Sequence, residues 1–238
     1  FGADSEVEIP EPDVPGAAPW SDLEKLRREK EVVGVYISGH PLDTYKVEMD
    51  HFVKNRVKDL AKIQEYIGKE MSFGGVVTEV KHLESRRGKP FGKFVLEDYT
   101  DSHDFLLFGD DYLQNKPQLT PGYFLFIKGV AEKWKRKDEE EYNYSFKIRV
   151  IEQLPDVLEK HANAIKIDLN LEDLNADFVK EITGLLKSHA GKNSLEMNVL
   201  DRDEKLEVSM KSRSVRVHLS QDLLDGLEKM GVEKYALS

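Results

Sequence analysis

Two short segments of this chain place cations beside aromatic rings, a pairing that suits contact with nucleic acid. The first runs from His82 to Gly92 and the second from Lys133 to Tyr144. Cations neutralise phosphates, and flat rings stack on bases that are not committed to a duplex. The candidate contacts for a single strand, in chain order, are Arg86, Arg87, Lys89, Phe91, Lys93, Lys133, Trp134, Lys135, Arg136, Tyr142 and Tyr144.

Both segments also have an ordinary structural explanation. The sequence Arg86-Arg87-Gly88-Lys89 suits a solvated hairpin, and the four acids of residues 138–141 oppose the bases beside them. Other aromatic and aliphatic residues of this region are expected in the core, namely Phe94, Leu96, Phe105, Leu107, Phe124 and Phe126. The pattern therefore predicts a binding face and leaves a solvated surface as the alternative.

Catalytic constellations are missing from the sequence. The seven histidines are scattered without the spacing of metal ligands, and the chain has no cysteine for a disulfide, a zinc knuckle or thiol chemistry. Two close acid pairs, Asp98 with Asp101 and Asp110 with Asp111, stand where caps and turns are expected. Neither a glycine-rich phosphate loop nor a nucleophile elbow occurs. We therefore assign no catalytic, cofactor-binding or metal-binding residue.

The net charge of −10 argues against a protein that simply coats nucleic acid. Its distribution is uneven, because residues 71–150 hold 13 Lys and Arg against 13 Asp and Glu. Charged residues make up 34% of the chain and hydrophobic ones 39%, which favours small modules with modest cores. Without an apolar run of about 18 residues, no membrane partner is expected. A chain without disulfides suits the cytoplasm.

The elements before residue 70 are predicted to be helical. Residues 1–19 are an acidic linker rich in Pro, Gly and Ala, and residues 20–69 form a helical connector. Ser21 and Glu24 predict a capping box at the start of the first helix. Gly39 and Pro41 are expected to end that helix. Two further helices are expected over about 42–52 and 57–67.

Residues 70–154 change to the period of two that is typical of strands. Five strands are expected around 76–80, 94–96, 104–108, 123–134 and 142–151, with a short helix at 110–115. Five strands with a helix between the third and fourth is the layout of the OB-fold, a partly open barrel. The pair Gly74-Gly75 predicts a bulge or a sharp bend in the first strand. The fold class is thus a multidomain α+β protein built around a five-stranded OB barrel.

After a linker at 155–163, residues 164–238 predict a small α+β domain in the order β-α-β-β-β-α. Its helices are expected at 173–189 and 222–230, and its later strands at 194–200, 206–210 and 215–219. One face of the last helix, Leu223, Leu227 and Met230 with Leu224, is a candidate partner surface, with the core as the competing explanation. The tail 232–237 is a second candidate, as an extended docking segment.

Three features in one order carry a resemblance to a known family. They are the segment Glu29 to Leu42 (EKEVVGVYISGHPL), an OB barrel about thirty residues later with Phe108-Gly109-Asp110 after its third strand, and the small C-terminal α+β unit. In this order they resemble the region of the bacterial DNA polymerase III alpha subunit beyond its catalytic core. The resemblance covers essentially the whole chain after residue 19.

The resemblance implies a replicative DNA-directed DNA polymerase as the parent protein, in the bacterial cytoplasm. It implies that the OB domain takes single-stranded template and that residues 164–238 bind the tau subunit of the clamp loader. A sliding-clamp peptide, roughly Gln-x-x-Leu-Phe, would lie just upstream, and Phe1 is expected to be its last residue. The catalytic carboxylates and their Mg²⁺ would also lie upstream, so none is assigned here.

Two alternatives remain open at this point. In the first, the barrel binds no DNA and the chain is a protein-interaction scaffold, in keeping with its acidic balance. In the second, the barrel is the tRNA-binding OB domain of a synthetase, which would prefer structured RNA. The segment ending in Ser38-Gly39-His40-Pro41 argues against the second.

Overall fold

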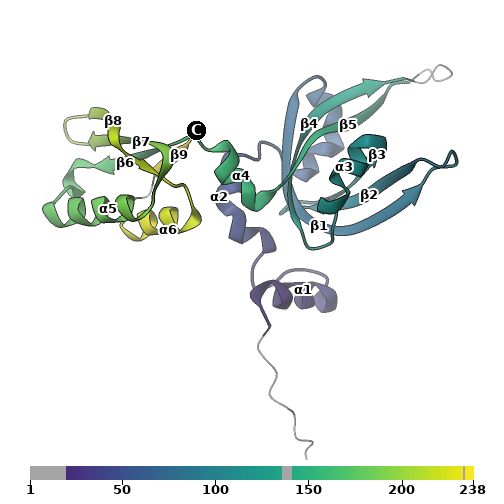
Figure 1. Cartoon of the computed structure of the whole chain (residues 1–238), viewed down its shortest axis with the longest axis horizontal. Coiled ribbons are helices and arrows are strands. Elements are labelled where there is room, and N and C mark those ends of the chain that lie inside the picture. Colours follow the sequence, from purple (N-terminus) through teal and green to yellow (C-terminus); the bar gives the residue numbers. More distant parts are fainter. Residues whose placement is uncertain (1–19, 136–140, 233) are drawn as a thin grey trace, which may run out of the picture. The chain divides into compact units, whose positions relative to one another are not determined.

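The computed structural model describes residues 20–135, 141–232 and 234–238, apart from the side chain of Asp22 (Figure 1). Two compact units divide the chain, residues 1–41 and residues 42–238. Within the described ranges, no helix is both long and apolar enough to cross a membrane.

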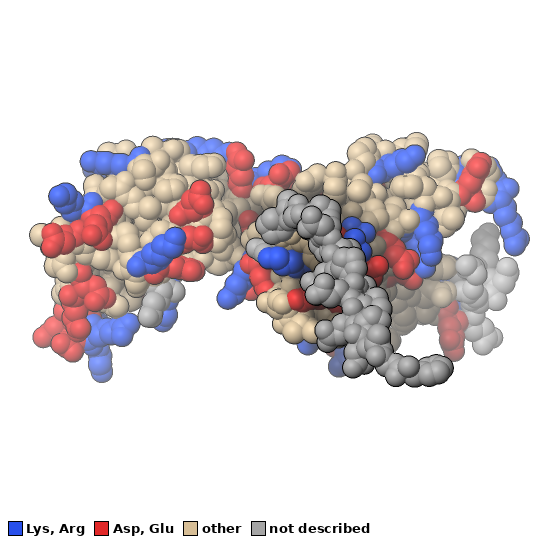
Figure 2. All heavy atoms as spheres, turned by 90° about the horizontal axis from the view of Figure 1, so that it is seen from below, with Lys and Arg blue, Asp and Glu red and all other residues tan. Residues whose placement is uncertain are grey.

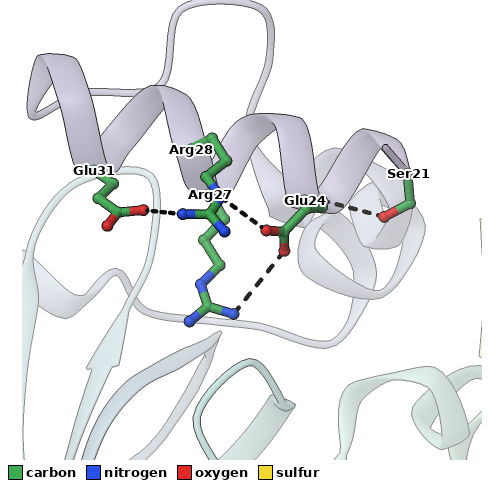
Figure 3. Close-up of polar contacts among 5 residues, drawn as sticks. All are labelled: Ser21, Glu24, Arg27, Arg28 and Glu31. Carbon is green, nitrogen blue, oxygen red and sulfur yellow. Dashed lines mark hydrogen bonds and ion pairs between the residues drawn. The ribbon is translucent and has the colours of Figure 1, made fainter. Parts of the chain in front are cut away.

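The first unit is built on helix α1, Asp22–Val33. The Ser21 hydroxyl accepts the backbone N–H of Glu24 at 3.3 Å, which confirms the predicted N-cap. The Glu24 carboxylate turns away from the cap and accepts from Arg28 Nε at 3.0 Å, with Arg27 at 4.0 Å (Figure 3). Arg28 also reaches Glu31 at 3.0 Å. The reciprocal half of the capping box is replaced by pairs along one helix face.

Helix α1 ends earlier than the sequence predicts. Gly34 adopts a left-handed φ of 86° and its N–H bonds to the carbonyl of Lys30, so Gly34 rather than Gly39 is the stop. The chain then folds back on the helix, where the Glu29 carboxylate accepts the N–H groups of Ile37 and Ser38 at 3.0 Å each and the Ser38 hydroxyl. The prediction failed because a side chain holds this return segment, and local spacing does not show such a contact.

Between α1 and the sheet, the predicted helices are present, largely as tighter turns. A 3-10 helix at Pro41–Tyr45 leads into α2, Lys46–His51, and a second 3-10 helix spans Val57–Tyr66. The second begins where the Val57 N–H donates to the buried carboxylate of Asp98 at 2.9 Å. This bond ties the connector to the turn after the second strand of the sheet.

The next elements form the predicted OB-fold. Strands β1 (Glu70–Glu84), β2 (Pro90–Glu97) and β3 (Ser102–Phe108) precede helix α3 (Gly109–Asn115), and β4 (Phe124–Trp134) and β5 (Asn143–Gln153) follow. The sheet order is β3-β2-β1-β4-β5, with every neighbouring pair antiparallel. Its core includes Phe73, Phe94, Leu96, Phe105 and Leu107, as expected of the last four. Figure 1 shows the β1–β2 and β4–β5 hairpins projecting from the same end of the barrel.

The glycine pair in β1 has a different purpose from the one predicted. The register shift against β2 lies between Val77 and Glu79, beyond the glycines. A Cβ on Gly75 would lie 2.6 Å from the carbonyl oxygen of Glu97, so Gly75 permits close approach of β2. The bulge prediction was wrong in position, because strand contacts far apart in sequence set it.

The C-terminal part follows helix α4, Leu154–His161. It contains β6 (Ala164–Asn170), α5 (Ala176–Ser188), β7 (Ala190–Asp201), β8 (Leu206–Val217), α6 (Gln221–Lys229) and β9 (Lys234–Leu237). The sheet order is β8-β7-β6-β9, parallel only between β6 and β7. In Figure 1 both α5 and α6 lie on one side of this sheet.

Three predictions for this part were wrong. Residues 206–217 form one strand rather than two, so the order is β-α-β-β-α-β. The tail is not free, because β9 pairs antiparallel with β6. Helix α5 begins after Asn175, whose side chain accepts the N–H of Phe178, and not at Asp173. In each case the partner strand or cap, and not the local pattern, sets the limit.

Candidate nucleic-acid interface

The outer face of β1, β2 and β3 carries the first predicted cluster. Along β2 the buried residues Gly92, Phe94 and Leu96 alternate with Phe91 and Lys93, which point outward. Strand β3 pairs Phe108 with Phe91 and Leu106 with Lys93, which puts these side chains on the same outer face. We call the surface formed by Leu83, Phe91, Lys93, Leu106 and Phe108 the outer platform.

Two phenylalanines form the aromatic centre of the outer platform. The rings of Phe91 and Phe108 stack with centroids 5.4 Å apart and planes 24° from parallel. Phe108 is 59% exposed, so one face of this stack is open to solvent. On the inner side, Gly92 leaves room for the ring of Tyr112 from α3, which a Cβ would meet at 2.7 Å. The packing of α3 thus fixes the strand positions that present the rings.

Cations surround this aromatic pair, and only some of them are engaged. Lys93 pairs with Asp104 at 2.8 Å and Lys81 with Glu79 at 3.6 Å. At the tip of the β1–β2 hairpin, Arg86, Arg87 and Lys89 are exposed, and no ion pair holds them within the described part of the chain. Figure 2 shows basic side chains at this tip. These three cations are available to phosphate groups.

The tip itself is a short turn closed by hydrogen bonds between Ser85 and Lys89. The N–H of Ser85 donates to the Lys89 carbonyl at 2.9 Å, and the N–H of Lys89 donates to the Ser85 hydroxyl at 3.1 Å. Gly88 takes a left-handed φ of 70°, which glycine adopts without strain. The predicted loop from His82 to Gly92 is therefore mostly strand, with only Ser85–Lys89 as turn.

The β4–β5 hairpin carries the second predicted cluster. The ammonium groups of Lys133 and Lys135 lie 5.0 Å and 5.6 Å from the ring centroid of Tyr142. Trp134 and Tyr144 are 42% exposed, and Tyr144 pairs across the hairpin with Lys133. Both cations therefore lie against an aromatic face that would otherwise be open to a base. Arg136 lies outside the described residues.

A hollow of about 780 Å³ lies between the two edge strands of the barrel, β3 and β5. The less exposed residues Phe105, Leu107, Phe146 and Ile148 form its floor. Its edge includes Trp134, Tyr144, Asp111 and Glu132, and also Leu106 and Phe108 of the outer platform. Burial lowers the pKa of His103 in this hollow, while Asp104 and Asp101 act in the opposite direction. The hollow is apolar in its floor and bears no excess of cations, so the outer platform is better suited to phosphate.

Sequence reasoning missed part of the platform. The sequence pattern identifies Phe108 only as the residue at the end of the third strand and does not single out Leu83 or Leu106. The signal was present, because Phe105 and Leu107 were expected inside and strict alternation then puts Leu106 and Phe108 outside. The neighbouring position of Phe91 and Phe108 was not readable, since it depends on the register of β2 with β3.

The predicted partner residues lie elsewhere. Leu223 and Leu227 are fully buried and Met230 is partly buried, all within the core of the C-terminal part. The competing explanation, the core, therefore holds for the two leucines. Phe1 lies outside the described residues. No group of three or more His, Asp or Glu side chains suits a metal ion in the ranges that the structure describes.

Comparison with known families gives two matches, in the order seen in the structure. Residues 71–154 match the OB-fold nucleic acid binding domain, and residues 165–235 match the DNA polymerase III alpha subunit, C-terminal domain. The chain corresponds to the C-terminal region of DNA polymerase III alpha subunits. The predicted resemblance is thereby confirmed.

Several DNA polymerase III alpha subunits are similar in sequence to this chain, over different shares of its length. DNA polymerase III subunit alpha of Thermus aquaticus is 28% identical over 235 residues, which is 96% of this chain and 18% of the relative. The Aquifex aeolicus protein is 24% identical over 89% of the chain and 18% of the relative. That of Borreliella burgdorferi is 34% identical over 46% of the chain and 10% of the relative. The chain spans less than a fifth of the length of these relatives.

Among solved structures, the mitochondrial single-stranded DNA binding protein Rim1 of S. cerevisiae is similar to part of the chain. It is 14% identical with a TM-score of 0.28, and the match covers 36% of this chain and 95% of Rim1.

Proposed function

We propose that the OB barrel binds single-stranded nucleic acid on the outer platform, as the template-handling part of a replicative DNA polymerase. The observation that carries this proposal is the exposed ring of Phe108, stacked on the half-buried Phe91, near three cations that have no ion pair within the described part of the chain. The match of residues 71–154 to the OB-fold nucleic acid binding domain supports the proposal.

The mechanism follows from the chemistry of the platform. A base that stacks on the exposed ring of Phe108 gains about 1–3 kcal/mol, and every base offers such a face. Arg86, Arg87 and Lys89 then neutralise phosphates of the strand and release condensed counterions. Binding should therefore tolerate any sequence, prefer single strands to duplex and weaken with salt. The β4–β5 hairpin, with Lys133, Trp134 and Tyr144, would extend the contact.

The cationic part is tested with the triple variant Arg86→Ala, Arg87→Ala and Lys89→Ala. Fluorescence anisotropy of a labelled single-stranded oligonucleotide, at several salt concentrations, measures affinity and its salt dependence. We expect weaker binding and a salt slope shallower by about 2, because each lost phosphate contact contributes about 0.7 on single strands. The matched control changes Lys58, Lys116 and Lys147 to Ala. An affinity and slope equal to those of the control would refute the assignment.

The aromatic part is tested at Phe108. Phe108→Ala should reduce affinity for the single strand by about 5- to 150-fold while leaving the salt slope unchanged, because stacking involves no counterion. Phe108→Trp, which keeps a flat ring, should retain binding. If both variants lose affinity equally, the ring is not a stacking platform.

The rest of the family role is proposed from membership alone. We propose that residues 164–238 dock the clamp-loader tau subunit, and that the parent alpha subunit is a DNA-directed DNA polymerase of the bacterial cytoplasm that uses Mg²⁺ through carboxylates outside this chain. Support comes from the match of residues 165–235.

Tau docking can be measured by titrating tau onto the immobilised 238-residue chain. Because Leu223 and Leu227 are buried, their substitution should affect tau only through loss of folding. Tau binding together with salt-independent or absent DNA binding would instead favour the scaffold alternative. Preference for structured RNA would favour the tRNA-binding alternative.

A further inference from the structure

Strand β8 is continuous but bulges away from its partner where it passes the start of β7, and we call this bulge the excursion. Ser194 of β7 pairs with Arg216, and Glu196 pairs with Lys211, so two steps along β7 match five along β8. The N–H of Val215 donates to the Ser212 hydroxyl at 3.0 Å, and Val215 packs against the core beside the fully buried Val217. The excursion is thus fixed at its base, and bulges of this kind redirect side chains.

The redirected side chains surround a hollow of about 540 Å³, which we call the β8 hollow. It is lined by Ser194, Lys211, Ser212, Arg213 and Arg216. Every lining residue carries a hydrogen-bond donor, and three are cations. The lining contains no apolar side chain on which a base or a hydrophobic peptide residue would rest.

The cations of the β8 hollow are only partly compensated. Lys211 lies 3.2 Å from Glu196, and Arg216 donates to the carbonyl oxygen of Lys192 at 3.5 Å. In the described part of the chain, no carboxylate pairs with Arg213. One carboxylate among three cations leaves an excess of positive charge with free donors.

This positive charge is local to the hollow. Residues 164–238 hold eleven Lys and Arg against fourteen Asp and Glu, whereas residues 211–216 hold three bases and no acid. Figure 2 shows acidic and basic side chains interspersed over the C-terminal part on the face turned to the viewer. A basic composition therefore does not explain the cluster. An anion with several acceptor oxygens does fit it.

We propose that the β8 hollow binds phosphate groups of a nucleic-acid backbone. Two guanidinium groups offer planar, two-pronged donors that match phosphate oxygens, and the Ser194 and Ser212 hydroxyls supply further donors. An acidic peptide would also need positions for its intervening side chains, and the all-polar lining provides none. The contact takes no base, so it is indifferent to sequence and to strandedness. It is separate from the outer platform and goes beyond the proposed function of the barrel.

The test uses the 238-residue chain with Arg213→Gln and Arg216→Gln, and a control with Lys180→Gln and Arg202→Gln that removes the same charge elsewhere in this part. Labelled duplex DNA is the main probe, because the platform prefers single strands. We expect the salt slope for duplex to fall by about 1.8 in the hollow variant, since each phosphate contact contributes about 0.9 on duplex DNA. On a single strand the fall should be about 1.4. The control should fall by less than half as much.

Further arms separate this proposal from others. The variant Arg213→Lys with Arg216→Lys keeps the charge, so its salt slope should stay near that of the unchanged chain. Equal melting temperatures of the Gln variant and the unchanged chain exclude misfolding as the cause of the Gln effect. Equal slopes for the hollow variant and the control would overturn the proposal. So would displacement of duplex by polyglutamate of equal charge as readily as by unlabelled duplex. Stabilisation by inorganic phosphate without any binding of duplex would mark a free-anion site and also overturn it.

The two proposals fail independently. If the outer-platform triple variant abolishes single-strand binding and the hollow variant matches its control, the barrel function stands and the hollow proposal falls. If duplex binding depends on the hollow while the platform variant does not change single-strand binding, the hollow proposal stands and the barrel function falls.

Discussion

Two buried carboxylates, Asp98 and Glu48, have opposite surroundings. Asp98 is 4% exposed and accepts four bonds, from the N–H groups of Val57, Thr100 and Asp101 and from the Thr100 hydroxyl. Glu48 is 5% exposed, and its Oε2 has no hydrogen-bond partner. Burial raises the pKa of Glu48, opposed by a hydrogen bond to its own backbone and by His51. One acid therefore organises a turn, while the other is costly when ionised.

We expect Asp98→Ala to lower the free energy of unfolding by about 2–4 kcal/mol, because it leaves the buried Val57 N–H without an acceptor and frees the turn. Urea denaturation measures the change. Glu65→Ala, at an exposed position, is the control and should change it by less than about 0.5 kcal/mol. A loss at Asp98 no larger than that at Glu65 would show that the turn holds without it.

Glu48 should give a measurable pH dependence. A carboxyl whose folded pKa is raised stabilises the fold fully below its ordinary value of 4.5, and this contribution is lost as the pH rises through the raised pKa. Glu48→Met removes the titrating group at similar size. We expect the variant to have a higher melting temperature than the unchanged chain at pH 7 but not at pH 4. A difference that stays constant with pH would contradict the raised pKa.

At the scale of elements, two glycines differ in the space around them: Gly75 lies against the backbone of a neighbouring strand, and Gly184 does not. A Cβ added to Gly75 in β1 would lie 2.6 Å from the carbonyl oxygen of Glu97. A Cβ added to Gly184 within α5 would have no other atom within 4 Å. The same substitution should therefore have opposite effects in the two elements. Strand β1 requires a residue without a side chain at position 75. In helix α5, the glycine at position 184 gives no packing advantage and only adds the entropic cost of ordering a flexible residue.

Gly75→Ala should destabilise the chain by about 1–3 kcal/mol, since β1 and β2 must separate to accept the methyl group. Gly184→Ala should stabilise it by about 0.5–1 kcal/mol, because alanine is the better helix former. Chemical denaturation of both variants gives the comparison. A shift of the same sign in both would mean that propensity, and not close approach, decides at Gly75.

At the scale of the whole molecule, the last residues of the chain form an edge strand of the second sheet. Strand β9 pairs with β6, and the carbonyl oxygen of Ser238 accepts the N–H groups of Asn163 at 2.5 Å and Ala164 at 2.8 Å. The ring of Tyr235 also stacks on His51 of α2, with centroids 5.6 Å apart. The last residues are thus structural, and removing them exposes the edge of β6.

Truncation after Gly231 should accelerate amide hydrogen exchange throughout β6 and β7 while leaving exchange in β1 to β5 nearly unchanged. The reason is that the barrel has its own buried core, separate from the core that contains Val232. Loss of protection in the barrel as well would show that the two cores unfold as one.

The sequence alone determined the features that depend on near neighbours and on periodicity. The change from helical to alternating spacing located the OB barrel, Ser21 was readable as a cap, and the segment Glu29 to Leu42 pointed to the family. It also supplied the candidate cations and rings, although their roles stay predictions.

Only the tertiary structure decided which of these residues share a face. The extent of β8, the pairing of β9 and the stack of Phe91 on Phe108 all depend on partners that are distant along the chain. Period-two patterning says which side a residue faces, but register between strands is set by packing and by turns. That is why the pairing of Phe91 with Phe108 and the β8 hollow emerged only in three dimensions.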